Sequence, residues 1–165
     1  VVLDTGMLAK SGDPLLSGSS VDTLRKKLQP QVALITPNLP EAAALLDASH
    51  AQNEREMKEQ GNALLAMGCS AVLMKGGHLD DAESPDWLFT RDGAQRLTAP
   101  RVQTKNTHGT GCTLSAALAA LRPRNANWAD TVQEAKIWLS CALAKADSLE
   151  VGHGIGPVHH FHAWW

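Results

Sequence analysis

Three short apolar runs, separated by segments with helical periodicity, set the pattern of the first half of the chain. The runs cover Val1 to Asp4, Val32 to Thr36 and Ala71 to Lys75. Runs that are apolar at almost every position are typical of strands covered by helices on both faces, and such strands are usually parallel. The pattern therefore predicts an α/β fold with a doubly wound, mainly parallel sheet flanked by helices.

The segments between these runs carry the signals of helices. Apolar side chains recur at helical spacing from Val21 to Leu28, and Ser19 and Ser20 precede them as candidate caps. A second helix is expected to begin after Asn38, which is a good N-cap residue and is followed by proline in the first turn. A third is expected over Glu54 to Met67, ending at a glycine.

The second half of the chain has a different pattern. The letters WLFT and QRLTA flank RDGA, which predicts a β-hairpin with Asp92 and Gly93 in its turn. A helix is expected after the glycine-rich stretch KNTHGTGC, and a longer one over Trp128 to Leu149, with Cys141 and Ala142 among its buried residues. The last 15 residues are too rich in glycine and proline to be regular.

Composition limits the architecture to one domain. The chain has 165 residues, of which 44% are hydrophobic and 19% charged, which is enough apolar material for a core. Residues 1–165 are therefore expected to form a single domain. The chain opens directly on an apolar run without an initiator Met, so we expect it to be a fragment of a longer chain.

Charge and cysteine usage narrow the choice of partners and compartment. Fifteen basic and 17 acidic side chains give a net charge of -2 and form no basic stripe, which argues against nucleic acid as a partner. No apolar run approaches the length of a membrane span. Three widely spaced cysteines without a CxxC pair indicate a reducing compartment, so a cytoplasmic location is expected.

The stretch from Gly109 to Cys112 is the first candidate for chemistry. Glycines let a backbone approach a ligand closely, and the amides that begin the following helix can bind an anion. A cysteine at this position would have its thiolate stabilised by the helix dipole, which would lower its pKa. The alternative is a tight turn followed by a cysteine that packs as a small hydrophobe, and for an isolated pattern this short the alternative is commoner.

Polar residues at the ends of the three apolar runs are the second candidate. Asp4, Asn38 and Lys75 each stand at or just after such an end, and Glu41 follows Asn38 by three positions. The carboxyl ends of parallel strands form the ligand-binding edge of an α/β sheet. A cation, carboxylates and a glycine turn are the parts that position a nucleoside triphosphate and Mg²⁺. Asn38 and Glu41 could equally form a capping box, and Lys75 could be a solvated strand-end residue.

Four motifs together resemble the ribokinase-type sugar and vitamin kinases. They are LDTGMLAKSGDPLL, LITPNLPEAAALL, VLMKGGH and KNTHGTGCTLSAALAA. Within that group the chain is similar, over almost its whole length, to the bacterial hydroxymethylpyrimidine and phosphomethylpyrimidine kinases of thiamine biosynthesis. The resemblance implies that the chain is the carboxyl-terminal portion of such an enzyme. The resemblance implies ATP and Mg²⁺ as cofactors and a pyrimidine alcohol, then its monophosphate, as substrates.

The resemblance also implies a role for each candidate residue. The usual family signature ends in an aspartate that acts as general base, and Cys112 replaces it here. The backbone from Gly109 through Thr110 and Gly111 would then bind the transferring phosphoryl group, and Thr107 would contact the nucleotide. Lys75 would lie against the phosphates of ATP. Glu41 would hold Mg²⁺, with help from Asn38 and Asp4.

Three other interpretations stay open at this point. Pyridoxal kinase activity is the enzyme alternative within the same fold, and a non-catalytic nucleotide- or pyrimidine-binding module is the alternative of a different class. A Cys–His hydrolase built from Cys112 and His108 is disfavoured, because His108 would lie in the turn and not on the helix. The strands that the resemblance implies before Val1 are not in this sequence, so we expect the 165 residues alone to be inactive and to self-associate as a homo-oligomer.

Overall fold

The computed structural model describes residues 1–7, 15–77 and 85–164. These residues form two compact units, Val1–Thr98 and Ala99–Trp165, and each unit is described by itself. Part of the first family-like motif, residues 8–14, lies outside the described residues, as does Trp165 of the tail. Among the described residues, no helix combines the length and the apolar character that crossing a bilayer requires.

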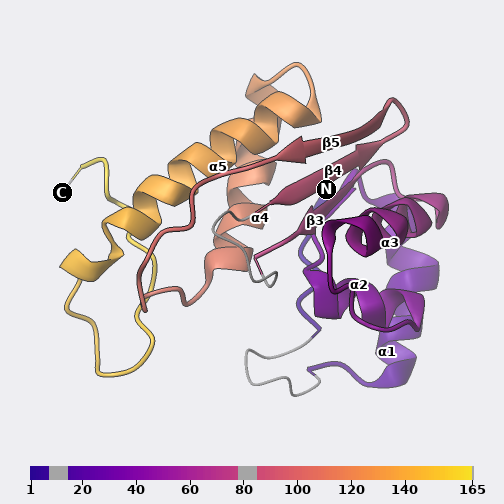
Figure 1. Cartoon of the computed structure of the whole chain (residues 1–165), viewed down its shortest axis with the longest axis horizontal. Coiled ribbons are helices and arrows are strands. Elements are labelled where there is room, and N and C mark those ends of the chain that lie inside the picture. Colours follow the sequence, from indigo (N-terminus) through magenta and orange to yellow (C-terminus); the bar gives the residue numbers. More distant parts are fainter. Residues whose placement is uncertain (8–14, 78–84, 165) are drawn as a thin grey trace. The chain divides into compact units, whose positions relative to one another are not determined.

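The first unit is built around a five-stranded sheet (Figure 1). Its strands are β1 (Val2–Leu3), β2 (Leu34–Ile35), β3 (Val72–Lys75), β4 (Asp86–Thr90) and β5 (Gly93–Leu97). They lie in the order β1-β2-β3-β4-β5, with parallel pairing from β1 to β3 and antiparallel pairing from β3 to β5. The predicted α/β class is confirmed, and the sheet is mixed because the hairpin adds two antiparallel strands.

Helices complete the first unit. They are α1 (Gly18–Thr23), which continues through a π-helical turn (Leu24–Leu28) and a 3₁₀ turn (Gln29–Gln31), α2 (Leu39–Leu46) and α3 (Glu54–Ala66). Figure 1 shows α2 and α3 lying against the strands, and both contact β3. The cap of α1 is Ser17, whose hydroxyl accepts from the Ser20 amide, so the prediction of Ser19 or Ser20 as the cap is wrong.

The core of the first unit lies between α2, α3 and the sheet. β2 and most of β3 are fully buried, which agrees with their continuous apolar sequence. Gly61 of α3 packs directly on the ring of Phe89 from β4, where a Cβ atom would collide with the ring. The largest buried side chains here include Ile35, Leu45, Met57, Leu64, Met74 and Phe89.

The turn of the β4–β5 hairpin differs from the prediction. Thr90 pairs with Gly93, so the two turn residues are Arg91 and Asp92, one position earlier than expected. Gly93 has φ of +133° and already belongs to β5. The glycine is therefore needed at the first ladder position and not inside the turn.

Two antiparallel helices dominate the second unit. They are α4 (Thr110–Leu121) and α5 (Trp128–Ala144), and short 3₁₀ turns follow them at Arg122–Arg124 and Ala146–Ser148. The two helices pack on each other, as Figure 1 shows. Because α5 gives way to a 3₁₀ turn after Ala144, the prediction of a continuous helix to Leu149 is only partly confirmed.

The buried face of α5 is set by a regular spacing of three and four residues. Val132, Ala135, Leu139 and Ala142 are all buried, so the prediction for Ala142 is confirmed. Cys141 is exposed, and the prediction that it is buried is wrong. One residue corresponds to about 100° around a helix, so the neighbour of a fully buried position turns toward solvent.

Candidate active site

Three neighbouring parallel strands bring polar residues to one edge of the sheet. Asp4 follows β1, Asn38 lies three residues beyond β2, and Lys75 is the last residue of β3. The Lys75 amide donates to the carbonyl of Pro37 at 2.8 Å, and Asn38 and Lys75 form a parallel bridge. The backbone ladder thus continues past the end of β2 and holds Asn38 beside Lys75.

Lys75 lies between two carboxylates. Its Nζ atom is 3.7 Å from Oδ1 of Asp4 and 3.9 Å from Oε2 of Glu41. The side chains of Lys75 and Glu41 are only 15% and 5% exposed, and that of Asp4 is 25% exposed. A half-buried ammonium with two carboxylates leaves one negative charge within the cluster, which favours the approach of a further cation.

Glu41 is fixed at the start of α2. Asn38 and Glu41 form a capping box: the Asn38 amide donates to Oε2 of Glu41 at 2.8 Å, and the Glu41 amide donates to Oδ1 of Asn38 at 2.8 Å. The hydroxyl of buried Thr5 donates to the same Oε2 atom at 3.0 Å. The capping interpretation is therefore confirmed. The capping box also holds the Glu41 carboxylate in one orientation beside Lys75.

The glycine turn of the second unit leads directly into α4. Gly109 is the N-cap residue with φ of +78°, a left-handed conformation that glycine adopts without strain, and it supplies no side-chain cap. The hydroxyl of Thr110 donates to the Thr107 carbonyl at 2.8 Å. The first amides of a helix have no acceptor within the helix, so this turn presents N–H groups suited to an anion.

Cys112 is the third residue of α4 and is exposed. His108 precedes the helix, and its amide donates to the Gly156 carbonyl at 3.0 Å, so the prediction that it lies in the turn is confirmed. Cys69, by contrast, is buried. Burial raises the pKa of the Cys69 thiol and favours its protonated form. An accessible thiol at a helix start is thus present at Cys112.

The structure groups some predicted residues and leaves others apart. Asp4, Asn38, Glu41 and Lys75 lie together in the first unit. Thr107 and the segment Gly109–Cys112 belong to the second unit, so the geometry that would relate them to Lys75 stays a prediction.

Sequence reasoning missed two buried residues that support these groups. Thr5 bonds to Glu41, and its position next to Asp4 at a strand end was the available signal. Asn106 precedes the glycine turn and bonds to Asp147 and Gly156, which lie 41 and 50 residues further along the chain. Nothing in the local pattern indicates partners at such separations.

Solved structures similar to this chain are ribokinase-like kinases. The ADP complex of Bacillus subtilis pyridoxal kinase matches 98% of this chain and 60% of its own, with a TM-score of 0.88 and 29% identity. Staphylococcus aureus pyridoxal kinase in complex with AMP-PCP and pyridoxal matches 99% and 58%, with a TM-score of 0.87 and 26% identity. Phosphomethylpyrimidine kinase from Clostridium difficile 630 matches 84% and 55%, with a TM-score of 0.71 and 33% identity.

Sequence comparison identifies the family. The family model described as phosphomethylpyrimidine kinase matches residues 1–159, and the chain therefore belongs to this family. It is 82% identical over all 165 residues to the hydroxymethylpyrimidine/phosphomethylpyrimidine kinase of Escherichia coli strain K12. The protein of the same name from Rhizobium meliloti strain 1021 is 47% identical over 99% of the chain. In both cases the chain spans 62% of the relative's length.

Proposed function

We propose that the protein is a cytoplasmic ATP- and Mg²⁺-dependent kinase of thiamine biosynthesis. It phosphorylates 4-amino-5-hydroxymethyl-2-methylpyrimidine and then the resulting monophosphate. The observation that carries this proposal is the 82% identity, over the whole chain, to the Escherichia coli relative named for both activities. Because the relatives are longer, the proposal treats the two units as parts of one larger kinase domain, and we expect the 165 residues alone to be inactive.

The cluster of the first unit has the composition needed at the phosphates of ATP. Lys75 would contact the phosphates with help from Asn38, and Glu41 would hold Mg²⁺, with Asp4 beside it. Mg²⁺ is usually held by one or two carboxylates together with substrate phosphates and water.

The turn of the second unit suits the transferring phosphoryl group. Gly109, Thr110 and Gly111 would direct amides toward its oxygens, and Thr107 would contact the nucleotide. Cys112, one residue further along α4, would accept the proton of the attacking alcohol. An alcohol must lose a proton, whereas a phosphate monoester with a second pKa of about 6 is already largely anionic near neutral pH. The thiol would therefore serve the first phosphorylation and contribute little to the second.

Pyridoxal kinase activity is the second candidate. The fold similarity favours it, because the pyridoxal kinases of Bacillus subtilis and Staphylococcus aureus match nearly the whole chain with TM-scores of 0.88 and 0.87. The identities to them are only 29% and 26%, against 82% for the Escherichia coli relative. Sequence similarity therefore favours the pyrimidine.

The test uses a full-length chimera in which this chain replaces the matching segment of the Escherichia coli relative. ADP formation is measured with the pyrimidine alcohol, its monophosphate and pyridoxal, with and without Mg²⁺. We expect both pyrimidines to be used, with kcat/KM about tenfold or more above that for pyridoxal. Preference for pyridoxal, or nucleotide binding without turnover, would overturn the proposal. Turnover by the 165-residue chain as a monodisperse monomer would contradict its expected inactivity.

A further inference from the structure

Asn106 stands three residues before Gly109 and is 7% exposed. Its side chain is fully used within the second unit. Oδ1 accepts from the Gly156 amide at 3.0 Å, and Nδ2 donates to Oδ1 of Asp147 at 2.9 Å and to the Ala146 carbonyl at 3.3 Å. A buried side-chain amide with all of these partners holds its neighbours in one arrangement.

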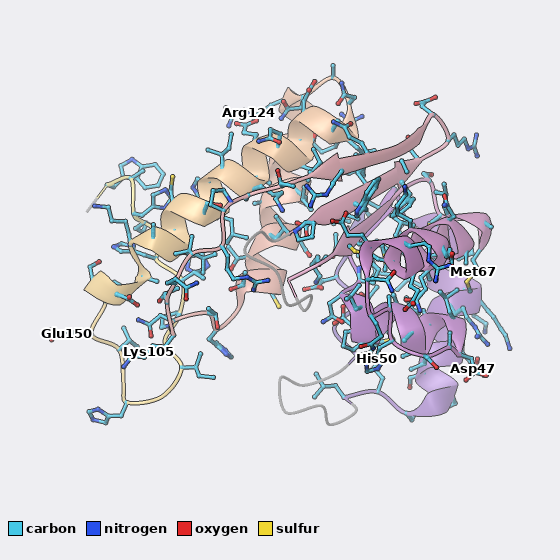
Figure 2. All side chains as sticks on the ribbon, viewed as in Figure 1. Asp47, His50, Met67, Lys105, Arg124 and Glu150 are labelled. Carbon is cyan, nitrogen blue, oxygen red and sulfur yellow. The ribbon has the colours of Figure 1, made fainter. Side chains whose placement is uncertain are left out.

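The partners of Asn106 come from two distant segments. Asp147 and Ala146 lie in the 3₁₀ turn after α5, and Gly156 lies in the irregular tail. Figure 2 shows Lys105 and Glu150, from the two loops that meet around this network, at the same end of α5. The segment before the glycine turn is therefore held by parts of the chain that follow it by about 40 to 50 residues.

Gly156 also contacts the backbone of the turn itself. Its carbonyl accepts from the His108 amide at 3.0 Å, and Pro157 forms a parallel bridge with His108. One residue of the tail thus bonds to both Asn106 and His108, in the manner of a short added strand. This pairing fixes the backbone up to the residue before Gly109.

The contact between Asn106 and Gly156 leaves no room for a side chain. A Cβ atom on Gly156 would collide with Oδ1 of Asn106 and would lie 2.8 Å from its Cγ. Gly154, two residues earlier, has nothing within 4 Å of such a Cβ and no left-handed φ. The chain thus offers a matched pair of glycines, of which only one is required by this packing.

We propose that Asn106 and Gly156 are positioning residues for the glycine turn. They fix the backbone from 106 to 108 and thereby the direction of the first amides of α4, without touching the substrate. This inference rests on the proposed function, in which those amides bind the transferring phosphoryl group. Preorganised donors lose much of their effect when displaced, and an error of about 1 Å can cost about 10²-fold in rate.

The first experiment compares Gly156→Ala with Gly154→Ala in the full-length chimera. Gly156→Ala is expected to lower kcat for the pyrimidine monophosphate by about 10- to 100-fold, because the turn moves. KM for the monophosphate should change by less than about twofold, since the proposed role of these amides is to contact the phosphoryl group transferred from ATP and not the pyrimidine monophosphate. Gly154→Ala should match the parent in both. Equal kinetics for the two variants would overturn the proposal.

A double variant tests whether the two residues act together. Asn106→Ala removes Oδ1 and Cγ and leaves only Cβ, at 3.4 Å from the position that the new methyl group of Gly156→Ala would occupy. Adding Gly156→Ala to Asn106→Ala should therefore cause no further loss in kcat, because the collision is gone. Losses that multiply would mean that the two residues act independently, and would overturn the proposal.

Hydrogen exchange separates this inference from the proposed function. Amide exchange at His108 and Thr113, whose amides donate to the carbonyls of Gly156 and Gly109, should accelerate in Gly156→Ala and not in Gly154→Ala, whether or not the chimera is active. An inactive parent chimera would refute the proposed function alone, while unchanged exchange at these amides would refute the positioning role. If Asn106→Ala does not fold, the two glycine variants still decide the question.

Discussion

The candidate residues fall into two groups, one in each unit, and the two groups are built in different ways. In the first unit the proposed functional groups are side chains: Lys75 lies between Asp4 and Glu41, and Thr5 and Asn38 orient Glu41. In the second unit they are backbone amides at the start of α4, shaped by a left-handed Gly109, with the thiol of Cys112 beside them. Removing one side chain should disable the first group, which we call the side-chain half of the candidate residues. The amides of the second group, the backbone half, should survive the loss of a side chain, including that of Cys112, and lose their effect when the backbone is displaced.

This difference also decides how charge is handled. Removing Lys75 would leave two carboxylates close together with no cation between them, which is costly for partly buried groups. The turn carries no charged side chain from Gly109 to Thr113. Its attraction for an anion comes from aligned peptide dipoles, which no single side-chain deletion removes.

The largest expected effect comes from removing the Cys112 thiol. If this removal slows both phosphorylation steps, the second unit depends on a side chain as the first unit does, and the comparison fails. In the full-length chimera, Cys112→Ala should slow phosphorylation of the alcohol about 10²- to 10⁴-fold more than phosphorylation of the monophosphate. The amides remain, so the second step should be nearly unchanged. Single-turnover rates for each substrate provide the measurement.

Two results would count against the base role of Cys112. Equal losses in both steps would mean that the thiol shapes the turn or its packing. No loss in either would mean that another group accepts the proton. Cys141→Ala is the matched control, since Cys141 is also exposed and lies on α5 of the same unit. It should leave both rates at the parent level.

The second prediction concerns the side-chain half and should show the opposite behaviour. Lys75→Met should lower kcat/KM for ATP by about 10²- to 10³-fold, which is the usual loss when one preorganised hydrogen-bond donor to a developing negative charge is removed. Both phosphorylation steps should fall by the same factor, because ATP is common to them. Steady-state kinetics with each substrate, together with a thermal unfolding curve to check folding, provide the measurement.

Lys58→Met is the control for that prediction. Lys58 is exposed on α3, and its Nζ atom lies 4.5 Å from the centre of the Trp87 ring. Losing this cation should leave catalysis unchanged and affect stability by about 0.5–1 kcal/mol at most. If Lys75→Met behaves in the same way, Lys75 only pairs with Asp4 and Glu41 and has no role at ATP, and the comparison of the two halves fails.

Local sequence patterns predicted the helices and strands better than they predicted the residues that hold the candidate site in place. Continuous apolar runs gave the buried strands β2 and β3, and Asn38 with Glu41 gave the start of α2, because these features depend on neighbours within a few residues. The predicted turn of the β4–β5 hairpin was wrong by one residue. The register of the two strands pairs Gly93 with Thr90, and composition alone does not determine that register. Such register depends on cross-strand pairing that a short window does not contain.

Long-range contacts account for what the sequence did not predict in the site. Thr5 reaches Glu41 across 36 residues, and Asn106 reaches Gly156 across 50. A threonine after a strand and an asparagine before a turn are common, so neither stands out without the fold. The residues proposed for chemistry were predictable because the proposed reaction needs a few particular side-chain types. The residues that hold them in place were not predictable, because many side-chain types can form such supporting hydrogen bonds.

The smallest expected effect tests whether any ion pair of the first unit would behave like the Lys75 cluster. Arg96, the next-to-last residue of β5, donates through Nε and Nη2 to the carboxylate of Glu54 at the start of α3, and these side chains are 36% and 32% exposed. The hydrogen bond from Arg96 lowers the pKa of Glu54 below its usual value of about 4.5. A lowered pKa in the folded state stabilises the protein above about pH 4.5, and this contribution is lost as the pH falls through the lowered value.

Arg96→Met should therefore reduce the free energy of unfolding by less than about 1 kcal/mol at pH 7, and the difference should shrink toward zero in acid. Kinetics at pH 7 should be those of the parent. Denaturant unfolding at both pH values provides the measurement, and a loss of catalysis would mean that charge in this unit acts regardless of its place in the fold.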